Sequence, residues 1–362
     1  MARQGSSSAP SLLPPRVFPS TGFDLIDRSE KIEEERLPFY NRDDYYPMRI
    51  GEVVNKHYQV VAKLGYGTSS TVWLCRDLRG GKYWVLKVHV NTLEHIQELE
   101  IYKHLSTVPE EHIGRGYIRD LKDSFDISGH HGKTHKVFIM TPLGMSLRSF
   151  QEMQKDHVFV PDLVKSALRQ VLMGLNYLHA SQVIHTDRFE KDLHSDNLLI
   201  AITDESIFSR VEEDEAQAPS ARKQADNGAY IYVSRYMMGG AGALTIGDLG
   251  QARLGVSGLK GPAMPTPYRA PEVILNMEWG AAVDMWSVAL VAWDLLETEG
   301  PFRIYSHDNQ EQNDAQHLAA MTALLGPPPR EFLLRSKDTA KYWDENGRFP
   351  SSCLTRLVLL LT

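Results

Sequence analysis

Cysteine is scarce in this sequence. The 362 residues include only two cysteines, Cys75 and Cys353, which lie far apart in the chain. Two distant cysteines cannot form the dense disulfide framework that stabilises small secreted domains. A reducing compartment, the cytoplasm or the nucleus, is therefore the expected location.

Long apolar runs are absent as well. No run approaches the roughly 20 residues that a membrane-spanning helix needs. The apolar residues 357–361 near the end of the chain form far too short a run. The sequence therefore predicts no membrane-spanning helix and no membrane partner.

Basic residues are not in excess. The chain holds 39 Lys and Arg against 46 Asp and Glu, which gives a formal net charge of −7. This balance argues against direct binding of nucleic acid, because nucleic-acid binders neutralise phosphates with a basic surface. It is compatible with a basic protein partner.

What the chain does have is an ordinary globular composition, with 42% hydrophobic residues in 362. This is enough for one large domain or two of ordinary size. Residues 1–40 are predicted to be a disordered tail. A small β-rich lobe follows, with strands predicted at 58–64, 71–75, 83–88 and 137–140 and a helix at 93–105.

After residue 144 the pattern becomes helical, with helices predicted at 147–154, 161–180 and 281–297. Residues 204–243 interrupt this pattern, because they are poor in hydrophobic residues and include an acidic run at 212–215. Such a composition predicts a flexible insert.

A polar loop between two short apolar runs, 183–184 and 198–200, carries several residues suited to chemistry. Asp192 stands five residues before Asn197. This spacing suits phosphoryl transfer, in which a carboxylate takes a hydroxyl proton while an amide oxygen holds a metal ion. Alone the spacing is a weak indication, because Asp and Asn also gather in ordinary turns.

Other features gain meaning only together. Gly65 and Gly67 lie in a hairpin loop, where glycines let backbone amides approach phosphates, although many hairpins contain glycine. Lys87 in an apolar strand and Glu98 in the next helix could be surface residues, or an ion pair that directs the ammonium at phosphate. Asp248 in D-L-G could bind magnesium or simply start a turn.

The order of these features, followed by A-P-E at 270–272, is that of the eukaryotic protein-kinase signatures. The chain resembles the SR-protein kinase family and its fungal relatives. The resemblance lies in L-G-Y-G-T-S-S-T-V-W-L (64–74), P-L-G (142–144), H-T-D (185–187) and Y-Y-P-M-R-I-G (45–51). It implies an α+β, two-lobed kinase fold, with a β-rich N-lobe over 41–143 and a helical C-lobe over 144–362 that lacks its last helices.

The resemblance also implies a serine/threonine kinase that uses ATP and Mg²⁺. It implies ATP contacts from Leu64, Gly65, Gly67, Val72, Lys87, Met140, Thr141 and Leu143. It implies metal ligands at Asn197 and Asp248, and catalytic roles for Lys87, Glu98 and one of Asp187 and Asp192. The implied partner of this expected monomer is a protein substrate, which could be Arg/Ser-rich.

Three departures from the family pattern, one of them the missing last helices, leave a second interpretation open. Five residues are inserted in the polar loop, either as 187–191 or as 188–192. The first placement keeps Asp192 at the right distance from Asn197 and is favoured, because base and metal must be positioned together. His194 also replaces the usual Lys. The alternative is a catalytically impaired, kinase-like scaffold that binds nucleotide or a basic partner protein.

Overall fold

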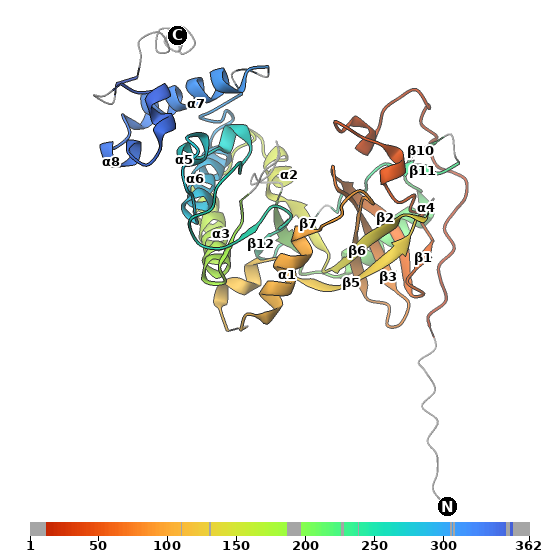
Figure 1. The fold of residues 1–362 in the computed structure, drawn as a ribbon. Coiled ribbons are helices and arrows are strands. Elements are labelled where there is room, and N and C mark those ends of the chain that lie inside the picture. Colours follow the sequence, from red (N-terminus) through yellow and green to blue (C-terminus); the bar gives the residue numbers. More distant parts are fainter. Residues whose placement is uncertain are drawn as a thin grey trace, which may run out of the picture. The chain divides into compact units, whose positions relative to one another are not determined.

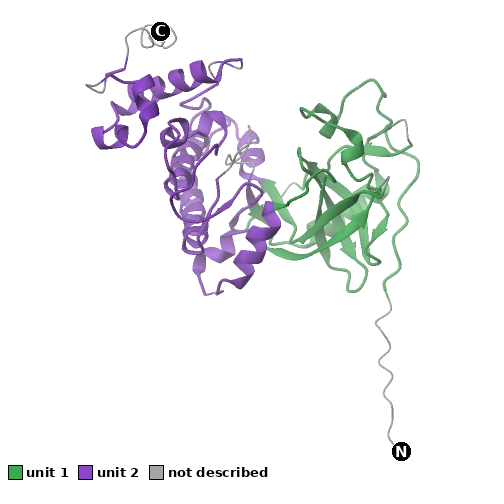
Figure 2. Cartoon of the chain, viewed as in Figure 1, with its two compact units in different colours: residues 1–96, 119–145, 200–242 green, residues 97–118, 146–199, 243–362 purple. Residues whose placement is uncertain are grey.

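The computed structural model describes residues 12–109, 111–129, 132–186, 197–225, 228–237, 239–304, 306, 308–344 and 348–349. Its chain divides into two compact units, shown in Figure 2. Unit 1 contains residues 1–96, 119–145 and 200–242, and unit 2 contains residues 97–118, 146–199 and 243–362. Each unit is thus assembled from three separate stretches of sequence.

Unit 1 is built on a six-stranded sheet in the order β1-β2-β3-β4-β6-β5, in which neighbouring strands are antiparallel (Figure 1). Its strands are β1 (Val53–Val54), β2 (Tyr58–Tyr66), β3 (Ser70–Asp77), β4 (Tyr83–His89), β5 (Leu121–Ser128) and β6 (Thr134–Met140). The short strand β7 (Leu143–Ser146) follows β6. The four predicted strands of this region are confirmed, because β-branched and aromatic residues dominate them. Strand β5 was not predicted.

Both faces of the sheet are covered, which is why β2 is buried from Tyr58 to Lys63. On one face, Val60, Trp73 and Leu86 belong to a single apolar cluster. On the other face, Ala62 and Leu74 pack with side chains from residues 200–242. Each large apolar side chain buried in this way stabilises the unit by about 1.5–3 kcal/mol.

Residues 204–243 differ from the flexible insert that their composition predicts. They form helix α4 (Ser206–Gln217) and a hairpin of β10 (Arg222–Gln224) and β11 (Tyr230–Tyr232). The low average hydrophobicity of the insert hides an apolar stripe on α4, where Phe208 and Val211 pack against the sheet. Residues 204–242 of the insert belong to unit 1.

Acidic residues of α4 are buried because cations meet them. Glu215 is 1% exposed and pairs with Arg222 at 3.5 Å and with Arg235 at 2.9 Å. Glu212 pairs with Arg76 of β3 at 3.3 Å. Burying a carboxylate is costly unless it is paired or hydrogen-bonded, and here the cations that pair with it come from other segments. The acidic run therefore helps to attach the insert.

The N-terminal segment was predicted to be a disordered tail over 1–40. Its described part, residues 12–40, instead contacts the rest of unit 1. The segment includes the 3-10 helix η1 (Glu33–Arg36). Glu34 forms an ion pair with Lys63, which is 1% exposed, and Glu35 contacts the Lys223 ammonium at 2.8 Å. We call residues 12–40 the strap. Glu33, Glu34 and Glu35 help to hold the strap against the rest of unit 1, because each contacts a lysine there.

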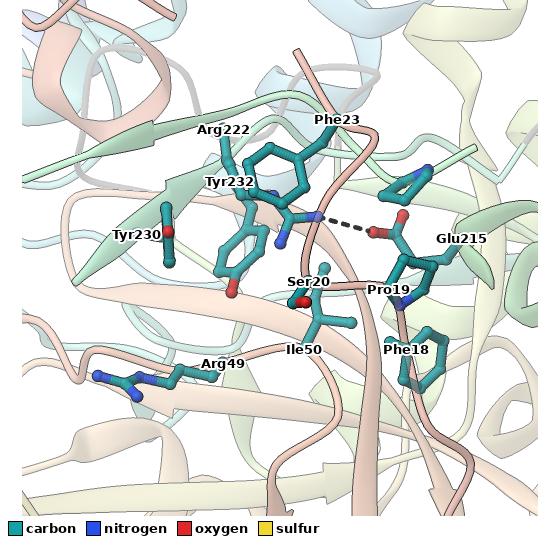
Figure 3. Close-up of a pocket in the computed structure, with 11 residues that line it drawn as sticks. Phe18, Pro19, Ser20, Phe23, Arg49, Ile50, Glu215, Arg222, Tyr230 and Tyr232 are labelled. Carbon is teal, nitrogen blue, oxygen red and sulfur yellow. Dashed lines mark ion pairs between the residues drawn. The ribbon is translucent and has the colours of Figure 1, made fainter. Parts of the chain in front are cut away.

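A cavity of about 200 Å³ lies where the strap meets the insert. Figure 3 shows its lining, in which the Arg222 side chain lies beside Phe23 and points toward Glu215. The Arg222 guanidinium is 3.9 Å from the ring centre of Phe23 and 4.6 Å from that of Tyr232, a cation–π geometry. None of the residues proposed from the sequence to bind ATP or metal lines this cavity.

Unit 2 is mainly helical (Figure 1). Its α-helices are α1 (Gln97–Thr107), α2 (Leu147–Glu152), α3 (Pro161–Ala180), α5 (Pro271–Ile274), α6 (Ala282–Leu296), α7 (Gln310–Leu325) and α8 (Arg330–Leu333). The predicted helices at 161–180 and 281–297 are confirmed. The helix predicted at 93–105 begins later, at Gln97.

Short strands and 3-10 turns connect these helices. The strands are β8 (Val183–Ile184), β9 (Leu198–Ala201), β12 (Leu244–Ile246) and β13 (Arg253–Leu254), and β9 begins in unit 2 and ends in unit 1. The 3-10 helices are η2 (Arg42–Asp44) in unit 1 and η3 (Ile113–Tyr117), η5 (Thr266–Tyr268) and η6 (Lys337–Lys341) in unit 2. Among the described residues, no helix is long and apolar enough to span a membrane.

Candidate active site

A row of candidate residues crosses three strands of unit 1. Gly65 on β2 is paired with Val72 on β3, and Val72 is paired with Lys87 on β4. Directly paired residues of antiparallel strands project from the same face of a sheet. The register therefore brings a glycine, an apolar side chain and an ammonium together on one face. Val72 and Lys87 are half-buried, so this part of the face stays accessible.

Two glycines, Gly65 near the end of β2 and Gly67 in the loop between β2 and β3, are not crowded by neighbouring atoms. A Cβ at Gly65 or at Gly67 would meet no atom within 4 Å, and neither residue has a positive φ. The open space beside both glycines lets a ligand approach the backbone closely, which is what phosphate binding by backbone N–H groups needs. These residues therefore fit the phosphates of ATP.

The segment after β6 contains the residues expected at the adenine end. Met140 ends β6, is buried, and is paired with Val85 of β4. Thr141 is exposed and Leu143, half-buried, begins β7. Since Pro142 has no N–H, only the Thr141 carbonyl and the Leu143 amide could meet a purine here.

Two apolar residues of β2 differ in their exposure. Leu64, expected at the ATP site, is half-buried next to Gly65. Ala62, two residues earlier, is fully buried in the cluster that includes Phe208 and Val211 of α4. The insert therefore covers the sheet at Ala62.

In unit 2, the backbone brings the two expected metal ligands onto neighbouring segments. The Gly247 N–H donates to the Asn197 carbonyl oxygen at 2.8 Å. Asp248, the next residue, is exposed and has a φ of 48°. A left-handed conformation is uncommon outside glycine and is found at functional sites. A carboxylate and an amide oxygen are suitable ligands for Mg²⁺, so the pair fits the ion.

Asp284 of α6 is a site residue that the sequence analysis missed. Its carboxylate accepts hydrogen bonds from the backbone N–H groups of His185 at 2.9 Å and Thr186 at 3.1 Å. The His179 ring contacts the same carboxylate at 2.8 Å. Asp284 is 2% exposed, so these contacts fix the start of the polar loop from the buried interior of unit 2. The available signal was a single acid near the start of a strongly apolar helix.

The start of the polar loop has further contacts. Thr186 has a φ of 26°, and its hydroxyl donates to the Gln251 carbonyl oxygen at 2.9 Å. The His185 ring lies 3.4 Å from the Gly247 carbonyl oxygen. Gly247 is the residue that also bonds Asn197. The loop start and the expected metal ligands are therefore linked through one backbone segment.

Three roles that were expected from the sequence are not tested by this geometry. Asp187 and Asp192, the alternatives for the base, lie outside the described residues, as does His194. Glu98 is buried in the first turn of α1, in unit 2, whereas Lys87 belongs to unit 1. The ion pair between Lys87 and Glu98 stays a prediction.

Comparison with known proteins decides the family. The model of the protein kinase domain matches residues 58–357. The chain belongs to the protein kinase family. Among curated relatives, this kinase is 40% identical to a serine/threonine protein kinase of Aspergillus fumigatus, over 94% of this chain and 82% of the relative. It is therefore a protein serine/threonine kinase, as predicted.

Two further relatives carry names of the SR-protein kinase type. The kinase is 32% identical to the serine/threonine-protein kinase SRPK of Physarum polycephalum, over 90% of this chain and 79% of that protein. It is 34% identical to SRSF protein kinase 3 of Sus scrofa, over 55% of this chain and 35% of that protein. The predicted family is therefore confirmed.

The fold is confirmed by a solved structure. The crystal structure of a kinase domain matches with a TM-score of 0.64 over 87% of each chain, at 22% sequence identity. An identity this low shows the fold alone. The two-lobed α+β kinase fold expected from the sequence is thus the fold of this chain.

Proposed function

We propose that this kinase transfers the γ-phosphate of ATP to serine in Arg-rich, RS-type protein segments. The observation that carries the transfer is the row of Gly65, Val72 and Lys87 on one face of the sheet. The substrate class rests on the relatives named SRPK and SRSF protein kinase 3. A net charge of −7 favours basic substrates. The cytoplasm or nucleus is the proposed location.

The residues have distinct roles in this proposal. Gly65 and Gly67 leave room for phosphates, and the Lys87 ammonium offsets their negative charge. Glu98 orients Lys87. Asn197 and Asp248 hold Mg²⁺, which when bound neutralises charge that develops on the phosphates.

The proposed reaction is an in-line transfer. The serine oxygen bonds to the γ-phosphorus while the bond from that phosphorus to the ADP oxygen breaks. The hydroxyl proton goes to a carboxylate, which we assign to Asp192. In this assignment the base and a metal ligand belong to one short segment of sequence, because Asp192 precedes Asn197 by five residues.

Transfer of labelled phosphate from ATP to an RS peptide tests the proposal. With Mg²⁺ we expect incorporation into serine, and with EDTA none. Lys87→Met should lower the rate by about 10²–10⁴-fold, since it removes a cation aimed at phosphate. Lys82→Met is the matched control, because Lys82 is exposed and lies over the Trp84 ring. Equal rates of transfer in Lys87→Met and Lys82→Met would indicate that Lys87 is an ordinary surface lysine.

Two single substitutions test the base. Asp192→Asn should abolish transfer, whereas Asp187→Asn should leave most of it. The reverse pattern would favour the other placement of the five inserted residues, 188–192.

The same assay separates the enzyme from the scaffold alternative. An impaired scaffold would bind nucleotide, and so raise its melting temperature with ATP and Mg²⁺, but would transfer no phosphate. Absence of both signals would contradict the nucleotide site itself. Transfer to a Ser peptide without Arg at the same rate as to the RS peptide would contradict only the proposed substrate class.

A further inference from the structure

Tyr45 reaches the glycine-rich loop from outside the sheet. Its hydroxyl lies 3.0 Å from the Gly67 carbonyl oxygen and 3.1 Å from the Thr68 carbonyl oxygen. A phenol has one proton to donate, so the two acceptors share it. Both carbonyls belong to the tip of the loop, beyond the last residue of β2.

Other contacts hold the ends of this loop and leave its tip to Tyr45. The Gly67 N–H donates to the Ser70 carbonyl oxygen at 2.8 Å, and the Val90 N–H donates to the Ser69 carbonyl oxygen at 2.9 Å. These bonds come from the loop itself and from the end of β4. Tyr45 therefore adds a tether from the segment that precedes the sheet.

The segment carrying Tyr45 is itself anchored. Asn91, just after β4, donates from its side chain to the Asp43 carbonyl oxygen at 2.7 Å and from its backbone to the Asp44 carbonyl oxygen at 3.0 Å. Tyr40 of the strap packs against the Tyr45 ring, with ring centres 5.3 Å apart. The hydroxyl is thus delivered to the loop from a fixed position.

The hydroxyl also keeps its proton. Burial, and then the charges of Glu34 and Asp44, raise the pKa of Tyr45 to about 12. The phenol therefore remains a hydrogen-bond donor throughout the range in which kinases are assayed.

We propose that Tyr45 is a positioning residue that holds the tip of the glycine-rich loop in place for the phosphates of ATP. This inference rests on the proposed function. Without the tether, the tip samples more conformations and binding must order it, which weakens binding of ATP. The strap and the residues that follow it thereby gain a role in nucleotide affinity.

The test compares two identical substitutions at neighbouring positions. Tyr45→Phe removes the hydroxyl that contacts the loop. Tyr46→Phe is the control, because the Tyr46 hydroxyl donates to Glu52 at 2.9 Å and the loop is not its partner. Each variant loses one hydroxyl and keeps its ring, so a general loss of stability would affect both.

Two measurements are made on both variants. A hydrogen bond of ordinary strength corresponds to about a fivefold change in an equilibrium. In Tyr45→Phe we expect amide hydrogen exchange at residues 67–70 to rise about fivefold without nucleotide. We expect KM for ATP to rise about three- to tenfold while kcat stays within twofold. In Tyr46→Phe neither quantity should change by more than about twofold.

The outcomes separate this inference from the proposed function. Equal exchange at 67–70 in the wild type and Tyr45→Phe would overturn the tether, whatever the activity. Raised exchange with an unchanged KM would overturn the role in ATP binding. If no phosphate transfer occurs in any variant, the proposed function fails, and ATP titration followed by the melting temperature replaces KM as the second measurement.

Discussion

Unit 1 presents Gly65, Val72 and Lys87 on paired strands, whereas unit 2 presents Asn197 and Asp248 outside its helices and strands. Gly65, Val72 and Lys87 are placed by the register of the sheet, in which each strand is held by a ladder of hydrogen bonds. The backbone N–H groups of His185 and Thr186 both donate to one buried carboxylate, that of Asp284. The Thr186 hydroxyl and the His185 ring each add one contact. Many hydrogen bonds share the positioning in the sheet, whereas a few side-chain contacts provide it at the loop start.

The two units differ again in two of their buried titratable groups. In unit 1, the carboxylate of Glu34 contacts the ammonium of Lys63. In unit 2, His317 of α7 is fully buried and neither of its ring nitrogens has a hydrogen-bond partner. The ion pair attaches one segment to another, and the buried histidine, which resists protonation, makes stability depend on pH.

The largest effect is expected at the anchor of unit 2. Asp284→Asn replaces a carboxylate oxygen by an NH₂ group that cannot accept from the backbone N–H of His185 or Thr186. The loop start should shift, and kcat should fall at least 100-fold, because catalytic groups tolerate only small displacements. Steady-state kinetics at a temperature where the variant is folded measures this.

Asp162→Asn is the matched control for Asp284→Asn. Asp162 is in α3 of the same unit, and its side chain is 93% exposed. Its activity should be that of the wild type. A kcat of Asp284→Asn within threefold of the wild-type value would contradict the dependence of the loop start on the Asp284 carboxylate.

A second effect, on stability and not on rate, is expected in unit 1. Lys63→Met leaves the Glu34 carboxylate buried without its cation, and Glu33, whose carboxylate is 3.4 Å from the Lys63 ammonium, loses a partner too. Removing one member of a buried pair costs about 3–5 kcal/mol. Urea unfolding followed by tryptophan fluorescence should show this loss of free energy of unfolding.

The double variant Lys63→Met with Glu34→Gln refines that prediction. Neutralising Glu34 should recover part of the loss, because the buried charge is gone. The exposed Lys82→Met should change stability by less than about 0.5 kcal/mol. A loss at Lys63→Met no larger than at Lys82→Met would mean that the strap is not attached through this pair.

The smallest effect is a pH dependence in unit 2. Burial lowers the pKa of His317 from 6.5 to about 3. Below about pH 6.5 the unfolded chain takes up a proton on His317, while the folded chain does not. The free energy of unfolding is therefore highest above pH 6.5, as far as this group is concerned, and falls as the pH is lowered. Between pH 7 and pH 5 the free energy of unfolding should fall by about 2 kcal/mol through this group.

His317→Met should remove that component of the pH dependence, because methionine has a similar volume and does not titrate. The measurement is urea unfolding at pH 7 and at pH 5. His95→Met, at an exposed histidine of unit 1, serves as the control and should retain the wild-type pH dependence. Identical slopes for both variants would show that His317 is not the titrating group.

Much of the fold could be predicted because its elements follow strong local patterns. Strands β2, β3, β4 and β6 carry β-branched and aromatic runs, α3 shows clear helical periodicity, and α6 is a long, strongly apolar run. The insert escaped prediction because its mean composition is polar. Its attachment depends on Phe208 and Val211, which share one face of α4, and on cations that lie far away in the sequence.

The sequence by itself, through motifs that resemble those of protein kinases in their order, indicated the family and the residues expected at its site. It could not determine which residues share a face or what a buried acid contacts. The register that aligns Gly65, Val72 and Lys87 was decided by strand pairing. The roles of Asp284 and Tyr45 were decided by tertiary contacts, because a carboxylate or phenol acquires its function from the groups that the fold brings within hydrogen-bonding distance.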